Sequence, residues 1–202
     1  MHIRDLKLFK GRKSNVLSVL TFNDASYWGA DIFIATIFAL YLTQNITGGT
    51  ATHVGIIYAI YRISRAFFAL PFGRFFDKNK GYLDEMWALV LSGLIVGSTY
   101  ITLFFATQLW QVYLAMIIIG IGHALNIGSW TVLFYNSMTK NQRGEVVGVY
   151  QTIMQVVYAL SAALAGFAGD VYGFEWIILA AGIVTILSGL APLTIRTVFK
   201  QE

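Results

Sequence analysis

The stretch ALPFGRFFDKNKGYLDE, residues 69–85, separates two long apolar runs by a short segment that is rich in charge. The upstream run begins near residue 53, and the downstream run resumes near Met86 and continues to about residue 106. Each run supplies the roughly 20 residues that a helix needs to cross a hydrocarbon core of about 30 Å. The stretch therefore predicts two membrane-spanning helices joined by a polar turn.

The same pattern repeats along the whole chain. Charged residues make up only 12% of the 202 residues, whereas soluble domains of this size carry about 25%. A soluble helical bundle, the alternative, would show polar residues on its exposed faces. The sequence therefore predicts an all-α integral membrane protein with six transmembrane helices, at approximately residues 16–42, 53–73, 85–106, 109–136, 145–168 and 174–195.

Lys and Arg residues gather at the chain ends and at every second connection between these runs. The connections TQNITGGTAT, ATQLWQ and GDVYGFE contain none of them. Because basic residues stay on the cytoplasmic side, this pattern predicts that both termini are cytoplasmic, in a plasma or inner cell membrane. We expect a cytoplasmic segment at residues 1–15, a six-helix bundle at 16–195 and a cytoplasmic tail at 196–202.

The remaining composition excludes several classes of function. The net charge of +4 is explained by the topology and does not indicate nucleic acid as a partner. The chain has no Cys and three scattered His residues, which predicts no metal site. The G-x-G of GIGHALNIG does not follow a strand, and no nucleophile–base pair is visible, so we expect neither a cofactor nor an enzyme.

The loop at residues 73–81 contains more than orientation requires, because acidic residues contribute little to topology. Its spacing resembles the G-x-x-x-D-[RK]-x-G-[RK]-[RK] loop of the major facilitator superfamily of secondary transporters. Gly73, Asp77 and Lys78 are in register, whereas the second Gly comes one position late and the basic pair after it is missing. Arg143-Gly144 in KNQRGEVVG resembles a second feature of that family, in the connection between the fourth and fifth helices.

The resemblance implies a transporter that moves a small molecule by alternating access. It assigns Gly73, Asp77, Lys78 and Arg143 to a gating loop that holds the cytoplasmic side closed. Family members have twelve helices in two halves, so this chain resembles one half, with its two helix triplets as a 3+3 inverted repeat. We expect a homodimer to restore the full architecture; the alternative is that the chain is a fragment. The antiporter signature of the fifth helix is absent.

Polar residues inside the apolar runs are the candidates for a binding site, because a charge within a membrane helix costs roughly 2.5–3.5 kcal/mol. Counting residues places Asp31 and Arg62 near the midplane, and Asp24 and Arg65 further toward the cytoplasm. Polar stripes on the fourth and fifth helices complete the predicted substrate- or proton-binding set, with His123, Asn126, Gln151 and Gln155.

Two interpretations of these charges remain open. The acids and bases either form a buried ion pair that fixes the packing of the first two helices, or face a cavity that binds substrate or a coupling proton. The corresponding alternatives for function are a proton-coupled transporter surrounded by membrane lipid and a non-transporting scaffold that kept the fold. The sequence does not identify the substrate, the coupling ion or the direction of transport.

Overall fold

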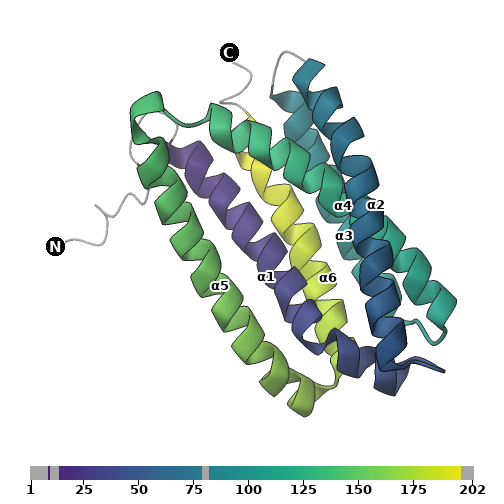
Figure 1. The fold of residues 1–202 in the computed structure, drawn as a ribbon. Helices are drawn as coiled ribbons and strands as arrows, with labels where there is room; N and C mark the ends of the chain where they lie inside the picture. Colours follow the sequence, from purple (N-terminus) through teal and green to yellow (C-terminus); the bar gives the residue numbers. More distant parts are fainter. Residues whose placement is uncertain (1–8, 10–13, 79–81, 197–202) are drawn as a thin grey trace.

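The structure, a computed structural model, describes residues 9, 14–78 and 82–196. Six helices account for most of these residues (Figure 1): α1 (Ser14–Asn45), α2 (Ala51–Lys78), α3 (Leu83–Phe104), α4 (Leu109–Asn136), α5 (Arg143–Tyr172) and α6 (Phe174–Leu190). The short 3₁₀ helices η2 (Lys140–Gln142) and η3 (Ala191–Ile195) precede α5 and follow α6. All six helices, α6 together with η3, are long and apolar enough to cross a membrane. The predicted number of spans is therefore confirmed.

The helix α2 extends further than the sequence pattern indicated. The segment Arg74–Lys78, expected to form a loop, continues the helix because it contains neither Gly nor Pro. Lys78 lies in the last turn, where its positive charge complements the negative end of the helix dipole. Gly73, Asp77 and Lys78 of the loop motif are thus helical residues, and residues 79–81 lie outside the described part of the chain.

A single glycine makes the connection between α5 and α6. Gly173 caps both helices and has φ of 89°, a conformation that residues with a Cβ atom rarely adopt. Next to it, the Asn45 side-chain amide donates a hydrogen bond of 3.0 Å to Glu175 Oε2, which ties the end of α1 to the start of α6. This end of the bundle is held by short connections.

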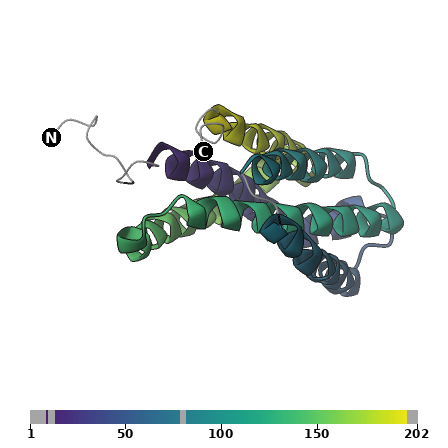
Figure 2. The same cartoon turned by 90° about the horizontal axis from the view of Figure 1, so that it is seen from above.

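The helices pack in a regular order. The helix α1 packs mainly against α5 and α6, α4 packs mainly against α2 and α3, and α3 packs against α6. Figure 2 shows α3 and α6 along one side of the bundle and α2 and α5 along the other, with α1 and α4 between them. The helices α2 and α5 bury few of their residues within the chain, in contrast to α3 and α4.

The contact between α3 and α6 depends on glycine. A Cβ atom added at Gly93 would lie 2.7 Å from Gly189 Cα, and one added at Gly97 would lie 2.6 Å from the Gly182 carbonyl oxygen. These distances are too short for any side chain, so the two backbones touch directly, as small residues allow in membrane helices.

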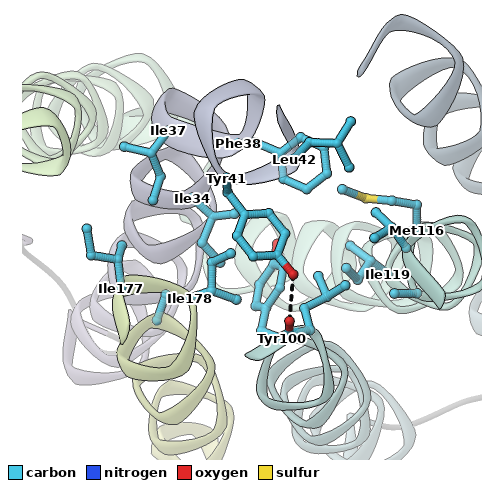
Figure 3. Close-up of a cluster of buried hydrophobic side chains, with 14 of the residues drawn as sticks. Ile34, Ile37, Phe38, Tyr41, Leu42, Tyr100, Met116, Ile119, Ile177 and Ile178 are labelled. Atoms are coloured by element: carbon cyan, nitrogen blue, oxygen red, sulfur yellow. Dashed lines mark hydrogen bonds between the residues drawn. The ribbon is translucent and has the colours of Figure 1, made fainter. Parts of the chain in front are cut away.

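The largest apolar cluster lies where α1 meets α3, α4 and α6. Figure 3 shows residues of this cluster from all four helices. One polar group within it, the Tyr41 hydroxyl, donates a hydrogen bond of 2.6 Å to the Leu103 carbonyl oxygen. The core therefore packs the central helix α1 against α6 and, through the Tyr41 hydrogen bond, holds it to α3.

Candidate functional site

Two polar cavities lie between α1, α2 and the helices around them. The first has a volume of about 200 Å³, and Asp31, Arg62 and Arg65 line it. The second has a volume of about 300 Å³, and Asp24 and Arg65 line it. Trp28, Arg65 and Tyr158 belong to both cavities. We name the two cavities and their lining residues the central site.

A larger cavity of about 650 Å³ lies elsewhere, between α1, α5 and α6. Among the described residues, no charged side chain lines it, and its walls are mostly apolar with a few hydroxyl groups. The charged residues predicted from the sequence therefore gather in the smaller cavities, which makes the central site the candidate functional site.

The Asp31 carboxylate connects four helices within the central site. The Tyr100 hydroxyl on α3 donates a hydrogen bond of 2.6 Å to Asp31 Oδ1. His123 Nε2 on α4 lies 3.7 Å from the same oxygen, which is too far for a hydrogen bond. His123 Nδ1 in turn lies 2.8 Å from the Tyr61 hydroxyl on α2. A polar chain therefore runs from α3 through α1 and α4 to α2.

The guanidinium groups of α2 lie at the end of this chain. Arg65 Nη1 donates a hydrogen bond of 3.1 Å to the Tyr61 hydroxyl, and its guanidinium carbon lies 5.3 Å from the Trp28 ring centre. The guanidinium carbon of Arg62 lies 5.3 Å from the Tyr61 ring centre. Both distances are within the range of cation–π attraction. Among the residues that the structure describes, no carboxylate lies within 4.0 Å of either guanidinium.

The buried ion pair between α1 and α2, one interpretation of the sequence, is therefore not formed between these residues. The two helices share few contacts, since each packs mainly against other helices. The acids instead accept hydrogen bonds from tyrosines, and the arginines stack on aromatic rings. Equal depth in the membrane did not bring the opposite charges together.

Asp24 forms a second pair of carboxylate and phenol. The Tyr150 hydroxyl on α5 donates a hydrogen bond of 2.5 Å to Asp24 Oδ2. Such short distances are typical of hydroxyl donors to ionised acceptors. The Asp24 residue is 2% exposed, and the Tyr150 ring packs against Trp130 with ring centres 4.8 Å apart. This pair links α1 to α5 at the second cavity.

The other predicted site residues lie outside the cavities. Asn126 is fully buried, and neither its side-chain nitrogen nor its oxygen has a hydrogen-bond partner among the described residues. Gln151 and Gln155 are exposed on α5 and line neither cavity. Of the predicted gating residues, Asp77, Lys78 and Arg143 are exposed at helix ends, and Gly73 is partly exposed.

Sequence reasoning missed the tyrosines that bind the two carboxylates. Tyr100 and Tyr150 looked like ordinary apolar helix residues, because a phenol is common in membrane helices. Their depth in the membrane could have indicated them as candidates. On the predicted spans, Tyr150 lies in the same half of the bilayer as Asp24, and Tyr100 lies in the same half as Asp31. Choosing these tyrosines from others at similar depth requires the helix packing.

These observations define an all-helical, multi-pass membrane protein with a polar site between its helices. A model of the Major Facilitator Superfamily matches residues 19–201, so the chain belongs to that family. It thus belongs to a family of transporters and is not an enzyme, and the described part of the chain contains six helices that could cross a membrane.

Relatives with curated names agree with the family. The chain is 28% identical over 159 residues to the uncharacterized MFS-type transporter YitZ of Bacillus subtilis, which covers 76% of this chain and 90% of that protein. It is 30% identical over 152 residues to the class H tetracycline resistance protein of Pasteurella multocida, which covers 75% of this chain and 37% of that protein. Mouse SLC18B1, an MFS-type transporter, is 24% identical over 200 residues, 92% of this chain and 42% of that protein. The chain thus spans less than half of the latter two.

Proposed function

We propose that this chain is a secondary transporter that moves a small solute by alternating access and couples this movement to a proton at Asp31. The observation that carries the proposal is the central site, where the Asp31 carboxylate and two arginines line a cavity inside a membrane-spanning bundle and the buried His123 lies 3.7 Å from that carboxylate. Ionisable residues at this depth are costly and mark substrate or proton pathways. Asp31 has a partly exposed side chain, at 23%, so a proton can reach it from the cavity.

The proposed unit is a homodimer. The helices α2 and α5 lie on one side of the bundle (Figure 2), and Arg62 on α2 and Gln151 and Gln155 on α5 are exposed. Lipid tails would leave these groups unsatisfied, whereas a second copy would cover them. A two-fold axis along the membrane normal would then repeat the central site across the interface.

The helix packing supports the proposed 3+3 inverted repeat. Exchanging the first three helices with the last three exchanges the pair α1–α5 with α4–α2, and the pair α1–α6 with α4–α3. The pair α3–α6 maps onto itself. Transporters of this type move one repeat or bundle against another around a fixed site, which suits the central position of α1 and α4.

The second candidate function is a membrane scaffold that does not transport. A scaffold would pack its charged residues away from water, and Asp24 at 2% exposure fits that description. Asp31, Arg62 and Arg65 fit it less well, because they line a cavity. The cavity therefore favours the transporter.

Cysteine labelling tests the proposal without knowledge of the substrate, because the chain has no Cys of its own. We expect Tyr58→Cys, in the first cavity, to react with a membrane-impermeant thiol reagent from both sides of oriented vesicles. The matched control, Leu89→Cys, replaces a fully buried core residue and should not react from either side. Labelling of position 58 from one side only, or from neither, would contradict alternating access.

The same approach tests the proposed plasma- or inner-membrane topology with cytoplasmic termini. Thr107 and Thr139 are exposed in connections at opposite ends of the bundle. We expect Thr139→Cys to react only from the cytoplasmic side and Thr107→Cys only from the outer side. The reverse pattern would overturn the orientation, and the mass of the detergent-solubilised protein would test the homodimer.

A further inference from the structure

The acids and bases of the central site differ in how they face the cavities. Asp24 is buried behind Tyr150, and Asp31 accepts its hydrogen bond from Tyr100. Arg62, by contrast, is exposed, and Asp31 and Arg65 are both partly exposed. The first cavity is therefore lined by one carboxylate, which already accepts a hydrogen bond from a tyrosine, and by two guanidinium groups.

The two guanidinium groups also keep most of their hydrogen-bonding capacity. A guanidinium offers five N–H donors in a planar arrangement that matches a carboxylate. Among the described residues, Arg65 donates only to Tyr61, and Arg62 makes no side-chain hydrogen bond. Arg62 and Arg65 lie three residues apart on α2, so their side chains are neighbours on one helix face. Together they present unused donors to a ligand in the cavity.

Aromatic rings form the walls next to these donors. Trp28 and Tyr158 line both cavities, and Tyr58 and Tyr61 line the first one. Small-molecule sites typically have volumes of about 300–1,000 Å³. The first cavity, of about 200 Å³, is smaller than that, and the second, of about 300 Å³, is at the lower limit, so the ligand must be small. Flat apolar groups pack well between such rings, in offset or edge-to-face arrangements.

We propose that the ligand of the central site is a small organic anion with a flat apolar part. Its anionic group, a carboxylate or a group of similar shape, is bound by Arg62 and Arg65, and its apolar part packs between Trp28 and the tyrosines. This inference rests on the proposed function in one respect: it takes the central site to be the substrate site.

The test uses three probes that share a ring system and differ in charge. The full chain in detergent is titrated with 2-naphthoate, with the neutral 2-naphthamide and with the cationic 2-naphthylmethylammonium, and binding is followed by calorimetry. We expect 2-naphthoate to bind at least tenfold more tightly than either of the other two. Equal binding of the three probes, or tightest binding of the cation, would overturn the inference.

Variants of the arginines locate the binding. Arg62→Gln and Arg65→Gln are each expected to weaken 2-naphthoate binding at least tenfold while leaving 2-naphthamide binding unchanged. Arg74→Gln is the matched control, because Arg74 lies on the same helix, is exposed and lines neither cavity. Arg62 is exposed, so its variant should fold even if the Arg65 variant does not. Equal loss in Arg74→Gln would contradict the assigned site.

The experiments distinguish a failure of the anion-site proposal from a failure of the proposed transport function. Labelling of Tyr58→Cys from both sides, without preference for the anion, would leave a transporter of another solute class and overturn the anion site. Arginine-dependent binding of 2-naphthoate, without labelling from both sides, would support the anion site and contradict transport.

Discussion

The two sides of the bundle are built differently. On one side, α3 and α6 touch at Gly93, Gly97, Gly182 and Gly189, where no side chain fits. On the other side, α2 and α5 bury few residues, Arg62 and Arg65 of α2 line the cavities, and Gln151 and Gln155 of α5 are exposed. The direct backbone contact leaves no space for a ligand between α3 and α6, whereas α2 and α5 leave most of their surface exposed and contribute lining residues to the cavities. We therefore interpret α3 and α6 as the rigid side and α2 and α5 as the functional side.

The largest expected effect lies on the rigid side. Gly97→Leu should prevent normal folding, because its Cβ alone would lie 2.6 Å from the Gly182 carbonyl oxygen. Overpacking costs typically 1–3 kcal/mol, and more where backbone must move. Gly166→Leu on α5 is the control, since no atom lies within 4 Å of a Cβ at that position. Thermal stability and size-exclusion profiles measure both, and equal stability of the two variants would refute the distinction between the sides.

The next effect lies in the central site. Asp31→Asn should abolish the dependence of transport on a pH gradient, because the amide cannot take up the proton, while the protein still folds. The rate of solute transport into proteoliposomes, measured with and without a pH gradient across the membrane, tests this effect. Asp170→Asn, at an exposed acid near the end of α5, should behave as the unaltered protein. A variant at Asp31 that keeps its response to the gradient would remove this residue from the coupling mechanism.

Two tyrosines that donate hydrogen bonds of equal length, one in the central site and one in the apolar core, allow a direct comparison of these two regions. Tyr100 donates to the Asp31 carboxylate and Tyr41 to the Leu103 carbonyl oxygen, each at 2.6 Å. Tyr41→Phe should lower stability by about 0.5–1.5 kcal/mol without changing the response of flux to pH. Tyr100→Phe should shift that response, because it removes the donor that stabilises the carboxylate. Similar effects of both variants on flux would show that the central site is not distinct from the core.

The smallest expected effect is at the end of α2. Asp77 is exposed there and matches the most specific position of the loop motif. We expect Asp77→Asn to change the rate of transport severalfold while membrane insertion stays normal, because it weakens the contacts that close the cytoplasmic side. Flux and the amount of inserted protein measure the two quantities. If flux equals that of Asp170→Asn, the loop serves topology alone.

Much of the fold could be predicted from the sequence because the membrane simplifies the problem. An apolar run of about 20 residues has one stable form in lipid, a helix, so the six runs fixed the number of spans. The ends of the helices are harder to predict from apolar runs, because a helix can continue into charged residues outside the lipid. The helix α2 does so and ends at Lys78, five residues after the predicted end of the span. The family motif at Gly73, Asp77 and Lys78 depends on residue identity and spacing alone, so the sequence is sufficient to detect it.

The partners of the charged residues could not be predicted in this way. Spacing along a helix gives the depth and the face of Asp31, but not which neighbouring helix that face meets. Depth alone favoured Arg62 as its partner, whereas the packing of α1 against α6, and of α3 against both α4 and α6, places Tyr100 and His123 next to it. That packing depends on glycine contacts between distant segments, such as Gly93 with Gly189. The sequence by itself determined the helices and their charges, and the tertiary structure decided which side chains meet, because lateral contacts between helices depend on the shapes of all six surfaces together.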